Sequence, residues 1–104
     1  MTVANVAPTV TALIDEYMTI LSNNDNYNRY EAHRGRKYIK IVRVQTSWGT
    51  GRSVHAFVDA AGNLYKAAGW NAPAKGIRFN LATDMAKLRT LIEAGDIYGS
   101  HLYR

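Results

Sequence analysis

Positive charge is concentrated in the centre of this chain, on side chains that can neutralise phosphate groups. Between residues 36 and 78 there are eight Lys and Arg residues and one acid, Asp59, whereas the rest of the 104-residue chain has five cations and seven acids. The eight cations are Arg36, Lys37, Lys40, Arg43, Arg52, Lys66, Lys75 and Arg78. Because cations that displace the counterions of a phosphate backbone provide much of the affinity for nucleic acid, we expect these residues to contact phosphates.

Aromatic residues lie among these cations, and two of them are candidates for stacking on bases. Trp48 lies between two strand-like segments beside Gly49, and Phe57 lies on a strand whose second face is open in the predicted fold. Stacking on an aromatic ring contributes about 1–3 kcal/mol per base. The alternative is that Trp48 covers a strand edge and that Phe57 belongs to a core covered by the C-terminal tail. We expect Trp70 to cap the core, since large rings are mostly buried.

The segment after the last predicted strand could add a further phosphate site. If Pro73 begins a helical turn, Lys75 and Arg78 lie three residues apart on one side of it. The alternative is a structural connection with incidental cations. The glycines and the Lys-Ser/Thr pair of a P-loop are missing.

Metal and catalytic chemistry have little support in this sequence. There is no cysteine, and the three histidines, His33, His55 and His101, lack the i, i+4 spacing of metal ligands. Ser47, Ser53 and Ser100 do not occur in a nucleophile-elbow pattern. We therefore expect no metal, no cofactor and no catalysis.

Length and composition indicate one small basic domain. The chain is 47% hydrophobic and 20% charged, which is typical of a folded globule of this size. We expect residues 1–104 to form a single domain, with the core at about residues 8–95 and a tail at 96–104. Residues 1–10 lack the features of a secretory signal, and no stretch approaches about 20 apolar residues. With no cysteine, a cytoplasmic location without membrane contact is expected.

Periodicity predicts an α+β fold with two helices and three strands. Apolar residues recur at helical spacing from Val10 to Leu21, whereas Val54, Ala56 and Val58 alternate as in a strand, which places His55 and Phe57 on the opposite face. The predicted elements are helix 8–21, an exposed loop 23–35, strands 38–46, 53–59 and 64–68, an irregular segment 69–80, and a helix from Leu81 that ends at Gly95.

The resulting order, α-β-β-β-α, predicts a three-stranded antiparallel meander with both helices packed on one face. Ile39 and Ile41 are out of phase with Val42 and Val44, which predicts a bulge or a strand covered on both faces. A two-residue turn at residues 62–63 would place Asp59 opposite Lys66. This element order resembles that of double-stranded-RNA-binding domains, but the basic start of their second helix is absent from residues 81–84.

Two parts of the chain resemble a known group of proteins. The first comprises Lys37-Tyr38-Ile39-Lys40-Ile41-Val42 with the strand at residues 53–59, and the second is the segment Gly62-Asn63-Leu64-Tyr65-Lys66 continued to residue 76. Over about residues 37–81 the chain is similar to small uncharacterised proteins of tailed bacteriophages, including phages of actinobacteria. The resemblance implies a phage-encoded protein in the host cytoplasm, and it implies no activity or functional residue.

We therefore predict a small non-catalytic protein that binds nucleic acid through a basic, aromatic-containing sheet surface. Single strands are favoured over duplex because the last helix carries only Lys87 and Arg89 off its apolar face. The alternative is a phage protein that binds an acidic surface of a host protein and modulates it, with Trp48, Tyr98 and Tyr103 as apolar anchors. A homodimer formed through a strand edge or the open sheet face is a third possibility.

Overall fold

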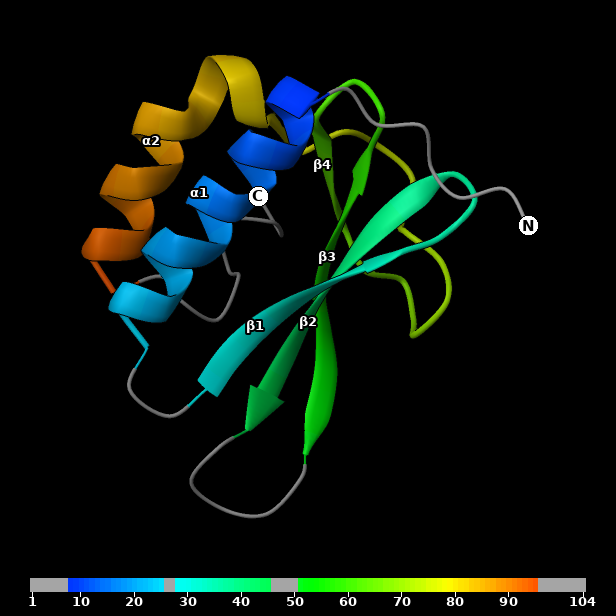
Figure 1. Cartoon of the computed structure of the whole chain (residues 1–104), viewed down its shortest axis with the longest axis horizontal. Helices are drawn as coiled ribbons and strands as arrows, with labels where there is room; N and C mark the ends of the chain where they lie inside the picture. The colour runs from blue at the N-terminus through cyan, green and yellow to red at the C-terminus, as the bar shows by residue number, and fades with distance from the viewer. Residues whose placement is uncertain (1–7, 26–27, 46–50, 96–104) are drawn as a thin grey trace.

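Five antiparallel strands form one sheet, and both helices lie on the same side of it (Figure 1). The computed structural model describes residues 8–25, 28–45 and 51–95, so Trp48 and the predicted tail lie outside the described residues. The elements are α1 (Pro8–Asn23), β1 (Asn28–Arg34), β2 (Tyr38–Gln45), β3 (Arg52–Asp59), β4 (Asn63–Lys66), β5 (Phe79–Asn80) and α2 (Leu81–Glu93). The predicted α+β class and antiparallel meander are confirmed, but the prediction of three strands is wrong, since β1 and β5 extend the sheet at both edges in the order β1-β2-β3-β4-β5.

The first helix forms as its apolar spacing predicts. Ile14, Tyr17 and Leu21 are completely or almost completely buried, and they recur every three or four residues along α1. They pack in one core with sheet residues such as Ile41 and with α2 residues such as Leu88. The helix therefore anchors the inner face of the sheet, which we define as the face covered by the helices.

The strand β1 replaces most of the loop predicted at residues 23–35. It pairs with β2 from Asn28 opposite Gln45 to Arg34 opposite Ile39, which leaves Tyr38 of β2 without a partner in β1. The prediction was wrong because Asn28–Arg34 has few apolar residues, so the alternation of apolar and polar residues that indicates a strand is missing from its sequence. The buried Asp25 carboxylate fixes the entrance to the strand, since it accepts hydrogen bonds from the Asn28 backbone N–H at 3.1 Å and from the Tyr30 hydroxyl at 2.8 Å.

A β-bulge lies at the middle of the sheet, but its extra residue is in β3 and not in the 38–46 strand, whose residues Ile39, Ile41, Val42 and Val44 are all buried, as expected for the alternative of a strand covered on both faces. Ile41 pairs with Ala56 and Val42 pairs with Val54, so His55 is the extra residue. The bulge turns His55 toward the helices, where its Nε2 lies 2.7 Å from the Tyr17 hydroxyl. The prediction that His55 shares a face with Phe57 is therefore wrong, because the bulge shifts the alternation by one residue.

The turn between β3 and β4 is longer than predicted, and this changes the cross-strand pairs. Val58 lies opposite Leu64, and Lys66 lies opposite Ala56 instead of Asp59. Asp59 stabilises the turn itself, since its Oδ1 accepts hydrogen bonds from the backbone N–H groups of Ala61 and Asn63. Gly62 has a φ of 84°, in the left-handed region that favours glycine.

The segment between β4 and β5 is irregular, as predicted, but it does not contain the helical turn proposed at Pro73. Within residues 67–78, Pro73 instead forms an isolated bridge with Ala67. The chain then returns to the sheet edge as β5, and Asn80 begins α2 by accepting hydrogen bonds from the backbone N–H groups of Ala82 and Thr83. As predicted, Gly95 follows the helix, with a φ of 108°.

Candidate functional site

The eight cations predicted to contact phosphates do not form one continuous strip. Arg36 and Lys37 lie in the β1–β2 turn and are exposed, and Lys40 follows on β2. Arg43 belongs to the inner side, because its Nε donates to the Tyr30 hydroxyl at 3.2 Å and its Nη2 lies 3.3 Å from His55 Nδ1. Arg43 therefore links the sheet to the bulge beside α1 and does not extend the outer charged surface.

The other four predicted contacts are dispersed over the molecule. Arg52 is on the outer face but forms an ion pair with Glu31 of β1. Lys66 is half-buried and, opposite Ala56, belongs to the inner side by strand register. Lys75 is exposed in the irregular segment, and Arg78 near its end is half-buried. The fold thus separates charges that the sequence places on one stretch.

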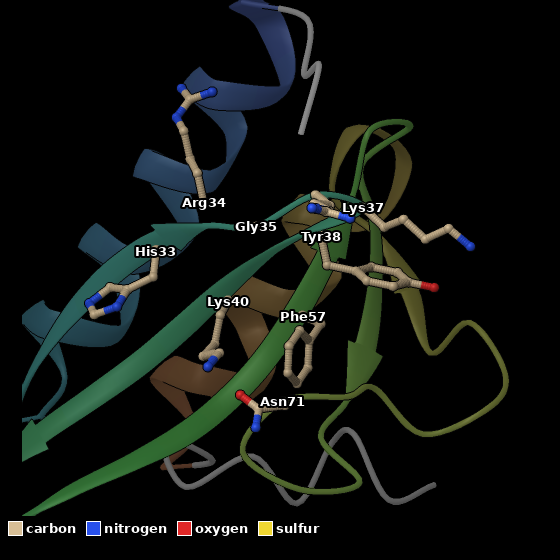
Figure 2. Close-up of a pocket in the computed structure, with 9 residues that line it drawn as sticks. His33, Arg34, Gly35, Lys37, Tyr38, Lys40, Phe57 and Asn71 are labelled. Carbon is tan, nitrogen blue, oxygen red and sulfur yellow. The ribbon is translucent and has the colours of Figure 1, made fainter. Parts of the chain in front are cut away.

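A pocket lies on the outer face, beside the β1–β2 turn (Figure 2). Its volume is about 390 Å³. We call it the hairpin pocket. The residues that line it are His33, Arg34, Gly35, Arg36, Lys37, Tyr38, Lys40, Phe57 and Asn71. Four of these nine are Lys or Arg, and none of them is acidic. The pocket is therefore a region of concentrated positive charge.

The side chains differ in how they meet this pocket. Figure 2 shows Lys40, Phe57 and Asn71 directed toward the same hollow, whereas the Arg34 and Lys37 side chains point away from it in different directions. Phe57 is 3% exposed, so its ring is a wall of the pocket and does not project into solvent. Lys40 thus presents its ammonium group near a polar amide and an aromatic wall.

Trp70 lies next to this pocket and is 46% exposed, so the prediction that it caps the core is wrong. The Lys40 Nζ lies 4.5 Å from the centroid of its ring, a cation–π contact. The irregular segment carries the ring over the outer face, away from the helix-covered core. As a result, an exposed aromatic surface adjoins the cationic pocket, a role that the sequence suggested for Trp48 and Phe57.

An aromatic cluster supports the far wall of the pocket. The Tyr38 ring meets Phe57 edge-on at a centroid distance of 6.1 Å and meets Tyr65 in the same way at 5.6 Å. The Tyr65 hydroxyl donates a hydrogen bond to the Asp59 carboxylate at 2.8 Å. This bond, with a smaller contribution from burial, raises the pKa of Tyr65 to about 12. The cluster holds Phe57 and Tyr38 in fixed positions.

Two carboxylates border the charged region, and both remain ionised at neutral pH. Hydrogen bonds from His33 and then Arg29 lower the pKa of Glu31 to about 2, and Arg52 acts in the same direction. Burial of the Asp59 carboxylate acts to raise its pKa, but hydrogen bonds from Asn63, Tyr65 and Ala61 outweigh it and lower the pKa. Each carboxylate therefore already accepts hydrogen bonds from neighbouring groups of the protein.

Comparison with known proteins assigns the chain to a family without assigning an activity. The model of a family of unknown function, DUF7717, matches residues 3–104. The chain belongs to this family. No curated protein and no solved structure matches it. The family match extends beyond the 37–81 region of the phage resemblance to both helices, and it says nothing about a phage origin.

Sequence reasoning did not assign His33, Arg34, Trp70 and Asn71 to the site, although a signal for the first two was visible. His33 and Arg34 end a run, His33-Arg34-Gly35-Arg36-Lys37, whose basic character is evident in the sequence. They were assigned to a loop because β1 was not predicted. Asn71 and its neighbour Trp70 had no such signal, because only the path of the irregular segment brings them over β2 and β3.

The described part of the chain carries no sign of a metal centre or of a membrane-spanning helix. It contains no group of three or more His, Cys, Asp or Glu side chains placed to hold a metal ion. No helix within it is long and apolar enough to cross a membrane.

Proposed function

We propose that this protein binds nucleic acid without catalysis, and that the hairpin pocket and Trp70 form the centre of the binding surface. The observation that carries the proposal is the cationic lining of the pocket, with no acid among its nine residues. Lys and Arg side chains in such a region displace counterions from phosphates. The exposed ring of Trp70 provides a surface for stacking a base beside them.

Single-stranded nucleic acid fits this surface better than duplex. A groove-binding helix would need several free cations, but Arg89 of α2 lies 3.6 Å from Glu16 of α1 and 3.9 Å from Glu93, which leaves Lys87 as the other cation of this helix. The pocket and the ring of Trp70 instead suit an unstacked base and its phosphate. Bases of a duplex are already stacked on one another and are not available to such a ring.

Titration of the ¹⁵N-labelled protein with a short single-stranded oligonucleotide tests the location of the surface. Amide signals of residues 33–40 and the indole signal of Trp70 should shift together, since these groups surround one pocket. Signals of α2 residues such as Lys87 provide the internal control and should stay in place. Binding that shifts α2 and leaves residues 33–40 unchanged would overturn the proposed location.

A second candidate function is binding to an acidic host protein, and the exposed apolar residues of the irregular segment favour it. Trp70 is 46% exposed and Ile77 is 56% exposed, and both are large side chains of the kind that anchor protein interfaces. The resemblance over residues 37–81 supports a phage gene as the source. A tagged copy that retains a host protein after nuclease treatment would favour this candidate, whereas complete loss of that protein would favour nucleic acid.

A further inference from the structure

The free positive charge of the outer face converges on one end of the sheet. Arg43 is turned to the inner side, and Arg52 is paired with Glu31. Among the described residues, by contrast, no hydrogen bond or ion pair involves the side chains of Arg36 and Lys40. The Lys40 ammonium makes the cation–π contact with Trp70. A surface that follows a strand needs cations at intervals along it, whereas Arg36 and Lys40 line the same pocket.

The size of the pocket also favours a single chemical unit over a length of chain. Its volume of about 390 Å³ lies near the lower end of the roughly 300–1,000 Å³ that is typical of small-ligand sites. A phosphate inside a strand carries one negative charge, whereas a phosphomonoester carries about −1.5 to −2 at neutral pH. The ligand best matched to a small pocket with two unpaired cations, Arg36 and Lys40, is therefore a phosphomonoester.

We propose that the hairpin pocket binds the terminal phosphate of a nucleic-acid strand, with Arg36 and Lys40 as its cationic contacts and Trp70 positioned to stack on the terminal base. This inference rests on the proposed nucleic-acid function and adds that strand ends are preferred to internal segments. Asn71 lines the same pocket and offers an amide donor and acceptor to the terminal nucleotide.

The test compares oligonucleotides of one sequence that differ at their ends. The probes are a linear single strand with a 5′-phosphate, one with a 3′-phosphate, one with hydroxyls at both ends, and a closed circle. One additional phosphate charge neutralised at about 0.1 M salt corresponds to about 5-fold in affinity for a single strand. One of the phosphorylated strands should therefore bind at least about 5-fold more tightly than the hydroxyl-ended strand and the circle.

Variants and a competitor locate the effect. Arg36→Gln with Lys40→Gln should remove the preference for the phosphorylated end, whereas the charge-matched control Lys87→Gln with Arg89→Gln should retain it. A nucleoside monophosphate at millimolar concentration should compete for the end-dependent part if the terminal nucleotide alone is recognised. If inorganic phosphate competed as strongly as the nucleoside monophosphate, the proposed stacking of the terminal base on Trp70 would be overturned.

The failure of this inference is distinguishable from failure of the proposed function. Equal binding of all four probes would overturn end recognition and leave nucleic-acid binding in place. No binding of any probe at low salt would overturn both. A preference for the phosphorylated end that survives in the Arg36→Gln and Lys40→Gln protein would overturn the assignment to this pocket.

Discussion

Removing the two cations of the β1–β2 turn should weaken nucleic-acid binding in a way that can be calculated beforehand. Arg36 and Lys37 are exposed, and within the described residues no hydrogen bond or ion pair involves their side chains. Their replacement by Ala therefore changes charge with little effect on folding. Each phosphate contact on a single strand contributes about 0.7 to the slope of log affinity against log salt, so two lost contacts should reduce that slope by about 1.4.

The same relation sets the loss at one salt concentration. At about 0.1 M salt, two contacts of this kind contribute about 1.4 decades, so the Arg36→Ala, Lys37→Ala protein should bind about 25-fold more weakly. The assay is fluorescence polarisation of a labelled single strand at four salt concentrations, with circular dichroism to show that the variant is folded. Lys87→Ala with Arg89→Ala removes the same charge from α2 and is the control. An unchanged slope in the turn variant, or an equal loss in the control, would refute the reasoning.

Three further predictions concern the framework that holds this surface. Tyr17→Phe removes the hydroxyl bonded to the buried His55 ring and should lower the free energy of unfolding by about 1–3 kcal/mol, whereas Tyr38→Phe, measured in the same urea titration, should change it little. Asn80→Ala should cost about 0.5–2 kcal/mol for the N-cap of α2 in addition to the loss of the Nδ2 hydrogen bond to Asn63, and Asn80→Ser should restore the capping part alone; equal losses would contradict the capping role. Because hydrogen bonds from His33 and Arg29 lower the pKa of Glu31 to about 2, its stabilising contribution should be present above its ordinary value of 4.5 and be lost as the pH falls toward 2. The urea midpoints of Glu31→Gln at pH 7 and pH 3 should therefore differ less than those of the natural protein. An equal difference in both proteins would show that the Glu31 carboxylate does not cause the pH dependence of stability.

The helices and the central strands could be predicted from the sequence because their apolar residues repeat with a clear period. Tyr17 and Leu88 lie in the core that this periodicity places them in. The phase change after Ile41 left open a bulge or a strand covered on both faces, and the bulge that occurs has its extra residue in β3. The edge strand β1 could not be predicted in this way, because its order depends on pairing with β2 and on polar contacts such as those of Asp25.

The candidate site was less predictable than the fold, since it depends on how distant segments meet. Sequence places Arg43 and Lys40 on one charged stretch, yet the strand sends Arg43 toward α1 and leaves Lys40 at the pocket. A side chain three residues along a strand points to the other face, and this alone separates the two. Trp70 lies in an irregular segment without a periodic apolar pattern, so its position could not be predicted from the sequence.

The most direct test of the central claim is the binding of labelled single-stranded and duplex oligonucleotides to the natural protein at low and moderate salt, measured by fluorescence polarisation. The account predicts micromolar or tighter binding that weakens as salt rises and is stronger for the single strand. Absence of binding to either oligonucleotide at low salt would contradict it and would leave the acidic host protein as the partner to seek.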